Sequence, residues 1–169
     1  MIRTDVQYIQ NNCLEVVMHV YITGSPEITS LLEAVTKRLD QIVDKGYAIL
    51  VGDNKGFDST IQKYFAMRKY RLVTVYVSGQ HTRYNEGAFG EVHISGWPGD
   101  SAVEFARLKN DAMIADADCA IAVWDGYSRA VRQDLEELLE YGKKVLLYWN
   151  GKMVLVRDTG ELKALRKVV

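Results

Sequence analysis

The chain has 169 residues, 48% of them hydrophobic, and a formal net charge of -1 at pH 7. This length and apolar content predict one domain, residues 1–169, with a substantial buried core. The near-neutral charge gives no reason to expect binding to nucleic acid, and no apolar run approaches the ~18 residues of a membrane span. Because the N-terminus also lacks a basic start followed by an apolar core, no secretory signal is expected and a cytoplasmic location is predicted.

The cysteines and histidines do not form a recognisable site. Cys13 and Cys119 are too few for a disulfide framework, and Cys119 lies in an apolar run, where a reduced and buried cysteine is expected. His81 and His93 lack cysteine or acidic partners at the spacing of metal ligands. No metal site and no cofactor are therefore predicted.

Segments rich in apolar and β-branched residues alternate with amphipathic segments along the chain. The expected strands cover residues 14–23, 47–51, 72–78, 119–124 and 143–149, with a further short strand at 91–94. The expected helices follow the first strand up to Gly46, cover 59–69 and 101–115, begin at Ser128, and cover 162–165.

The order of these segments predicts the fold class. Strands that alternate with helices are typical of an α/β fold with a Rossmann-like, doubly wound and mostly parallel sheet, here of about five strands. Asn150-Gly151 is a strong hairpin signal, so residues 153–156 are expected to return antiparallel as a C-terminal edge hairpin.

Polar and glycine residues follow three of the expected strands. They are Gly24 and Ser25 after the first, Gly52, Asp53, Lys55 and Gly56 after the second, and Asp125, Gly126, Ser128 and Arg129 after the fourth. In open α/β sheets ligands bind beyond the carboxyl ends of the strands, and helix N-termini there attract anions. These residues are therefore the candidate ligand-binding set.

Individual residues of this set suggest particular roles, each with a structural alternative. Asp125 follows a buried strand and is a candidate catalytic carboxylate, although it also fits an Asx turn. Ser128 fits a helix N-cap, and Arg129 could clamp a phosphate. Asp53 could accept a hydrogen bond from a sugar hydroxyl, whereas Asp58 fits a helix N-cap.

Residues 79–99 form a long glycine-rich connection, of the kind that often acts as a lid or binding loop. His81, Tyr84 and Glu86 in this segment are predicted to contact the base of a ligand.

Three segments together resemble the SLOG superfamily, and within it the small YspA/YpsA-like members related to the "lonely guy" phosphoribohydrolases. The segments are VYITGS (20–25), ILVGDNKGFDSTIQKYF (49–65) and ARLKNDAMIADADCAIAVWDGYSRAVRQDLE (106–136). The resemblance covers most of the chain, and its last segment is the most specific. It implies a nucleotide-derived ligand over the strand ends and a homodimer or higher homo-oligomer.

The resemblance also implies roles for residues of the last segment. In the glycosidase branches a glycine-threonine pair precedes a glutamate that helps to cleave an N-glycosidic bond. Ala130-Val131 stands at that pair and Asp134 at the glutamate, which makes Asp134 a second candidate catalytic residue. Lys109 falls where the phosphoribohydrolases carry an arginine, with Asn110 beside it.

Three functions remain open from the sequence. The first is hydrolysis of the N-glycosidic bond of a nucleoside monophosphate. The second is a non-catalytic sensor or carrier of a nucleotide-like ligand, which Ala130 favours because alanine denies the close backbone approach of glycine. The third is deoxyribosyl transfer, because the nucleoside deoxyribosyltransferases share a similar arrangement of strand, Asp/Gly and carboxylate.

Overall fold

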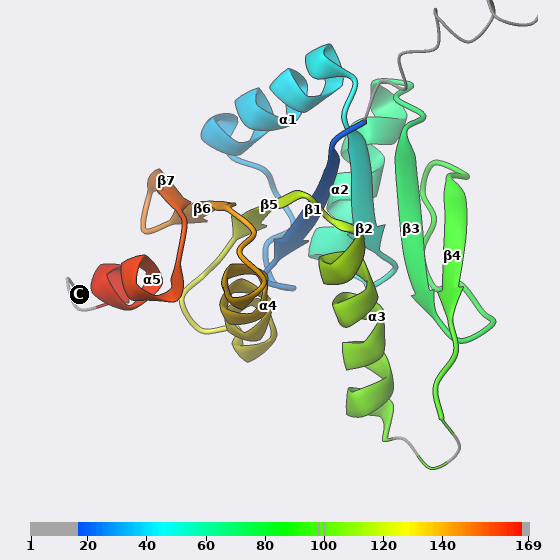
Figure 1. Ribbon diagram of the computed structural model, residues 1–169. Helices are drawn as coiled ribbons and strands as arrows, with labels where there is room; N and C mark the ends of the chain where they lie inside the picture. Colours follow the sequence, from blue (N-terminus) through cyan, green and yellow to red (C-terminus); the bar gives the residue numbers. More distant parts are fainter. Residues whose placement is uncertain (1–16, 98, 100, 167–169) are drawn as a thin grey trace, which may run out of the picture.

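The computed structural model describes residues 17–97, 99 and 101–166 (Figure 1). Its 7 strands form one sheet in the order β4-β3-β2-β1-β5-β6-β7. All neighbouring pairs are parallel except β6 and β7, which are antiparallel. The predicted Rossmann-like, mostly parallel α/β fold with a C-terminal edge hairpin is therefore confirmed, and the short strand near 91–94 extends the expected sheet of about five strands.

The bounds of the elements are as follows. The strands are β1 (His19–Gly24), β2 (Ala48–Gly52), β3 (Val73–Ser78), β4 (Gly90–Ile94), β5 (Cys119–Val123), β6 (Val145–Trp149) and β7 (Lys152–Val156). The helices are α1 (Glu33–Lys45), α2 (Phe57–Met67), α3 (Ala102–Asp116), α4 (Arg129–Glu140) and α5 (Thr159–Arg166).

The chain reverses its direction of travel across the sheet between β1 and β5. It lays β1, β2, β3 and β4 side by side toward one edge, and α3 then carries it back to place β5 on the other side of β1. The connections that leave the carboxyl ends of β1 and β5 therefore run to opposite faces of the sheet, which makes this a topological switch point, where α/β sheets commonly bind ligands.

Several local predictions are confirmed. Ser128 caps α4 by accepting a hydrogen bond from the backbone N–H of Val131. Asn150 and Gly151 both have positive φ, 49° and 77°, as a tight hairpin turn between β6 and β7 requires. The short strand expected near 91–94 is β4, which pairs in parallel with β3 although no helix connects the two.

Other boundaries differ from the sequence prediction. β1 begins at His19, and residues 14–16 of the expected strand, like Cys13, lie outside the described residues. α1 begins only at Glu33, so its N-terminus does not follow Ser25 directly. α2 begins at Phe57 after Gly56, so Asp58 lies inside the first turn and is not the N-cap.

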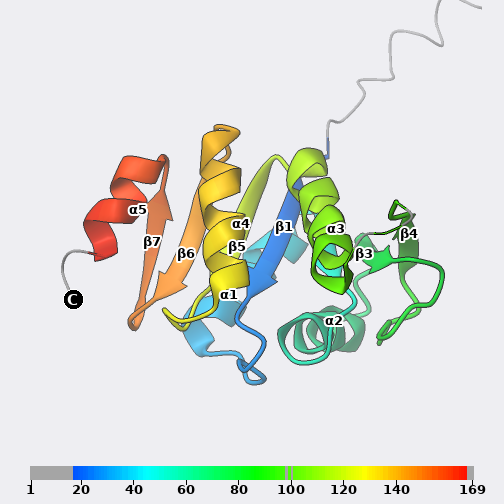
Figure 2. The ribbon, with the colours of Figure 1, turned by 90° about the horizontal axis from the view of Figure 1, so that it is seen from below.

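The helices cover the sheet in two layers, α1 and α2 on one face and α3 and α4 on the other (Figure 2). Each interface has its own apolar core. Phe57, Ile61 and Phe65 contribute to the first, whereas Met113, Leu135 and Leu138 contribute to the second. Among the described residues no helix has the length and apolarity needed to cross a bilayer.

Candidate functional site

Asp53, which follows β2, is completely buried and held by two cations. The ammonium of Lys109, on α3, lies 3.0 Å from Asp53 Oδ1 and is only 1% exposed. Arg83 donates to the same carboxylate through its guanidinium at 3.0 Å and through its backbone N–H at 3.1 Å. Burial opposes ionisation of Asp53, but the hydrogen bonds from Arg83 and the charge of Lys109 outweigh it and lower the pKa of Asp53. Protein donors therefore already occupy the carboxylate of Asp53, which was predicted to bind a sugar hydroxyl.

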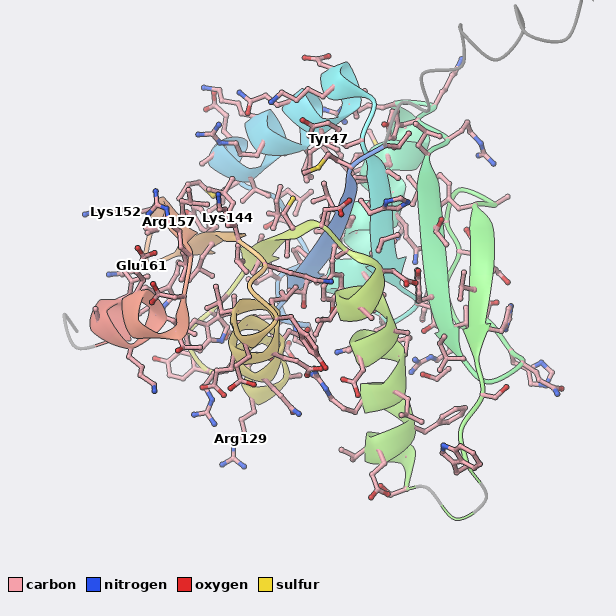
Figure 3. All side chains as sticks on the ribbon, viewed as in Figure 1. Tyr47, Arg129, Lys144, Lys152, Arg157 and Glu161 are labelled. Carbon is pink, nitrogen blue, oxygen red and sulfur yellow. The ribbon has the colours of Figure 1, made fainter. Side chains whose placement is uncertain are left out.

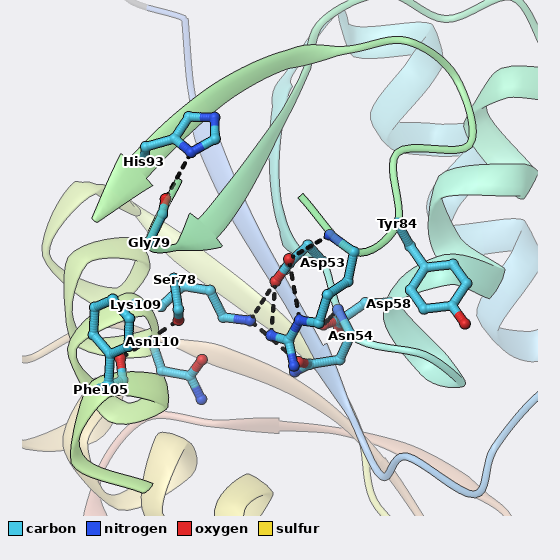
Figure 4. A network of polar contacts seen from close by, with 12 residues as sticks. Asp53, Asn54, Asp58, Ser78, Gly79, Tyr84, His93, Phe105, Lys109 and Asn110 are labelled. Atoms are coloured by element: carbon cyan, nitrogen blue, oxygen red, sulfur yellow. Dashed lines mark hydrogen bonds and ion pairs between the residues drawn. The ribbon is translucent and has the colours of Figure 1, made fainter. Parts of the chain in front are cut away.

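Asp58 places a second carboxyl beside Lys109 (Figure 4). Its Oδ2 accepts the backbone N–H of Asn54 at 3.1 Å. Oδ1 accepts no hydrogen bond in the described part of the chain, and Asp58 as a whole is half-buried, so Oδ1 keeps some contact with solvent. Burial raises the pKa of Asp58 to about 6, against the opposing effects of the Lys109 ammonium and the Asn54 N–H. This carboxyl therefore titrates close to neutral pH at the strand ends.

Gly52 makes this arrangement possible. A Cβ at position 52 would lie 2.4 Å from Asp58 Oδ2 and 3.3 Å from Lys109 Nζ. Gly52 was predicted to belong to the ligand-binding set, but here its missing side chain makes room for the carboxyl and ammonium groups of the protein itself. We call the surface around Asp53, Asp58 and Lys109, outside the carboxyl ends of the strands, the strand-end crevice.

Asp134, on α4, is 1% exposed and lies near enough to Asp58 that, after burial, its charge helps to raise the pKa of that carboxyl. Its carboxylate accepts hydrogen bonds from Tyr21 at 2.9 Å, Thr23 at 2.8 Å, Arg107 at 2.6 Å and Asn110 at 3.2 Å. Burial, and after it the charge of Asp134, holds the pKa of Tyr21 well above its usual value, so the phenol stays a neutral donor. A ligand atom would have to displace one of these donors to reach Asp134.

Asp125 forms an Asx turn at the end of β5. Its Oδ1 accepts the backbone N–H groups of Tyr127 at 2.8 Å and Ser128 at 2.9 Å. Slight burial opposes its ionisation, but these backbone hydrogen bonds outweigh it and lower the pKa of Asp125. The backbone N–H of Asp125 donates to Ser25 Oγ at 3.0 Å, which ties the ends of β1 and β5 together across the switch point. Gly126, within the turn, has a φ of 86°.

The remaining candidates are dispersed. A Cβ on Gly24 would lie 2.6 Å from the ring of Phe57, so this glycine serves helix packing. Lys55 and Gly56 line a different hollow, of about 530 Å³, between α1 and α2. Arg129, at the start of α4, is exposed and extends away from the body of the protein (Figure 3).

The connection between β3 and β4 is fastened to the body of the protein. Gln62 holds it by donating to the carbonyl of Tyr84 at 3.1 Å and accepting the N–H of Glu86 at 2.9 Å. The Glu86 side chain pairs with Lys63 at 3.6 Å, and Tyr84 points away from Asp53 and Lys109 (Figure 4). His81 is exposed. In this conformation none of the three predicted lid residues covers the crevice.

Sequence reasoning missed four residues that shape the crevice, namely Tyr21, Thr23, Arg83 and Arg107. Tyr21 and Thr23 are two residues apart on β1, so they share the face that α3 and α4 cover. Their hydroxyls in a buried strand were the only sequence signal for this network. Arg83 and Arg107 carry no such signal, because an arginine in a loop or on a helix is usually a solvated surface residue.

Within the described ranges, no cluster of three or more His, Cys, Asp or Glu side chains could hold a metal ion. The chain matches no protein-family model, no curated protein and no solved structure, so the functional proposal depends on the geometry of the crevice.

Proposed function

We propose that the protein binds a nucleotide-derived small molecule at the carboxyl ends of β1, β2 and β5 and hydrolyses the N-glycosidic bond of a nucleoside monophosphate. The observation that carries this proposal is Asp58, a carboxyl with one solvent-accessible oxygen beside a buried lysine at the strand ends. The switch point between β1 and β5 supports the location, because it opens the crevice that ligands use in such sheets.

Glycosidic cleavage of a nucleotide needs a proton donor for the departing base and negative charge near the developing oxocarbenium ion. A general acid is most effective when its pKa lies near the working pH, and the pKa of Asp58 is about 6. The buried carboxylates of Asp53 and Asp134 lie nearby, but Lys109, Arg83 and Arg107 balance their charges, so we assign them no direct role at the reacting carbon. Asp58 therefore replaces Asp125 and Asp134 as the leading catalytic candidate.

The proposed reaction balances with water as the only co-reactant. The glycosidic C–N bond breaks as the protonated Asp58 carboxyl gives its proton to the base nitrogen. Water adds to the anomeric carbon and returns a proton to the Asp58 carboxylate. The backbone N–H groups at the start of α4 are the proposed phosphate contacts, whereas the Arg129 side chain extends away from the site.

The test compares base release from a panel of purine and pyrimidine nucleoside monophosphates by wild type, Asp58→Asn and Asp44→Asn. Asp44 is the matched control, because it is an exposed carboxylate on α1. We expect Asp58→Asn to lower the rate by about a hundredfold or more, as for loss of a general acid, and Asp44→Asn to leave it unchanged. Equal rates for wild type and Asp58→Asn would remove Asp58 from the mechanism.

A non-catalytic sensor or carrier is the second candidate. This candidate is supported by the engagement of the two carboxylates that the sequence predicted to be catalytic. Asp125 forms an Asx turn, and Asp134 accepts hydrogen bonds from four donors. Thermal unfolding separates the readings, because a ligand at 100 times its dissociation constant adds about 2.7 kcal/mol of stability. Stabilisation by a nucleotide without base release supports the sensor, whereas no stabilisation by any nucleotide contradicts both.

Two further expectations stay predictions. Deoxyribosyl transfer would appear as exchange when a second base is supplied with a deoxynucleoside. Self-association into a homodimer or higher homo-oligomer is checked by light scattering during size-exclusion chromatography.

A further inference from the structure

A groove of about 340 Å³ lies at the amino ends of the strands, where β1, β5 and β6 begin and where the second half of α1 passes over them. Its floor is apolar and is formed by Val20, Ile42, Tyr47, Ile121, Leu146 and Leu155. No residue of the strand-end crevice lines it. The groove is therefore a separate feature of the molecule.

The floor is incompletely covered. Val20, Ile42 and Ile121 are at most 6% exposed, but Leu155 on the edge strand β7 is 41% exposed and Leu146 is half-buried. Scattered exposed leucines are ordinary, whereas a concave apolar surface of this size is typical of a ligand site. Small-molecule pockets commonly have volumes of ~300–1,000 Å³, and this groove falls at the lower end of that range.

The charged residues of the groove are all cations. Arg38, Lys45 and Lys144 line it, and no carboxylate does. Lys45 lies 5.7 Å from the centre of the Tyr47 ring, and Arg38 donates to the neutral amide of Gln41 at 2.9 Å. Among the described residues, none of these three cations has an acidic partner within salt-bridge distance. The methylene stems of such residues extend the apolar wall, while their charged ends remain available to an anion.

The register of the hairpin adds a fourth cation nearby. Val145 pairs with Val156, which brings Lys144 next to Arg157 (Figure 3). Arg157 pairs with Glu161 at 3.3 Å, so Lys144 is the freer of the two charges. An apolar floor with cations along its rim fits a molecule that has an apolar body and one anionic end.

We propose that this groove binds a free, single-chain carboxylate amphiphile, with the chain on the apolar floor and the carboxylate at Lys144 and Lys45. A second copy of the chain fits less well, because a two-fold interface through this groove would bring the same cations together. This site is independent of the nucleotide proposal, since it shares no residue with the crevice.

The test titrates the full-length protein with decanoate below its micelle concentration and follows binding by isothermal titration calorimetry. Decanol, which lacks the charge, and decyltrimethylammonium, which reverses it, are the ligand controls. We expect decanoate to bind at one site and at least about tenfold more tightly than either control, because the rim cations contribute only to the carboxylate.

Two variants locate the site. Leu155→Asp places a carboxylate on the floor and is expected to abolish detectable binding, whereas Val103→Asp, at an exposed apolar residue of α3, is its control. Lys144→Glu is expected to weaken decanoate binding about tenfold without affecting decanol, and Lys163→Glu on α5 is its control. Lys144 is exposed and forms no ion pair with any described residue, so this variant remains informative if Leu155→Asp does not fold.

Each alternative outcome contradicts the proposal. Equal binding of decanoate and decyltrimethylammonium would show that the groove does not select for negative charge. Binding to vesicles of phosphatidylglycerol but not to monomeric decanoate would indicate a membrane surface instead. Dimerisation that Lys144→Glu alters, without any decanoate binding, would assign the groove to self-association.

Discussion

At the carboxyl ends of the strands, Asp53, Lys109 and Asp134 are buried and paired, whereas at the amino ends the cations of the groove are exposed around an apolar floor. Lys109 and Asp53 are 1% and 0% exposed and lie 3.0 Å apart, but Lys144 at the amino ends has no acidic partner in the described part of the chain. Buried charges are stable only when they are paired, while exposed cations cost the fold little. Mutations in the two regions should therefore have different effects. In the crevice a mutation should change both ligand binding and the free energy of unfolding, whereas in the groove it should change ligand binding alone.

The largest expected effect on stability is at Asp134. Asp134→Ala removes the acceptor of four buried or half-buried donors and leaves the Arg107 guanidinium without this partner. We expect a loss of about 3–5 kcal/mol in the free energy of unfolding, as when one member of a buried pair is removed. Urea denaturation followed by circular dichroism measures it, with the exposed Glu140→Ala on the same helix as control. A loss similar to that of the control would show that the network does not hold α4 to the sheet.

Gly52→Ala is expected to have the next largest effect, because the added Cβ would lie 2.4 Å from Asp58 Oδ2. Moving Asp58 and Lys109 apart should cost about 1–3 kcal/mol of stability, as in other overpacked sites, and should weaken nucleotide binding as well. Gly90→Ala is the matched control, since a Cβ at this other strand-terminal glycine meets no atom within 4 Å. Equal stability of the two variants would mean that the crevice accommodates a methyl group.

A smaller, pH-dependent effect is expected from Asp58. Its pKa is raised from 3.8 to about 6, so the folded protein holds this proton more tightly than the unfolded chain does. The resulting stabilisation is fully present below the unfolded pKa and is lost as the pH rises through about 6. Relative to Asp58→Asn, the wild type should therefore lose about 2 kcal/mol between pH 4 and pH 7. Urea denaturation at four pH values, with Asp44→Asn as reference, would reveal a constant difference if Asp58 had an ordinary pKa.

The smallest expected effect is at the groove. Lys144→Ala should change the free energy of unfolding by less than about 0.5 kcal/mol, because an exposed residue without an ion pair contributes little. Thermal and urea unfolding both measure this. A loss of more than 1 kcal/mol, similar to that of the crevice variants, would mean that mutations at the two ends of the strands do not differ in their effect on stability.

Much of the fold follows from local patterns. The apolar runs identify the central strands, and Asn150-Gly151 and Ser128 fix a hairpin and a helix start through hydrogen bonds within a few residues. The predicted start of α1 was wrong. The eight residues after Gly24 form an irregular loop, but the spacing of their apolar side chains resembles that of a helix. Leu32, in that loop, is 54% exposed.

The sequence by itself determined the α/β class, the parallel sheet with its edge hairpin, and the strand ends as the place where polar residues gather. Only the tertiary structure decided the burial of each carboxyl group and its hydrogen-bond and charge partners. Lys109 and Asp53 are 56 residues apart in the chain, and Tyr21 and Asp134 are 113 apart. Backbone patterns repeat over a few residues and can be read locally, whereas burial and charge pairing depend on which distant segments meet. For that reason the sequence did not show that Asp125 forms a turn or that Asp134 accepts hydrogen bonds from β1 and α3. Nor did it show that Asp58, interpreted from the sequence as a helix cap, is a half-buried carboxyl with a raised pKa.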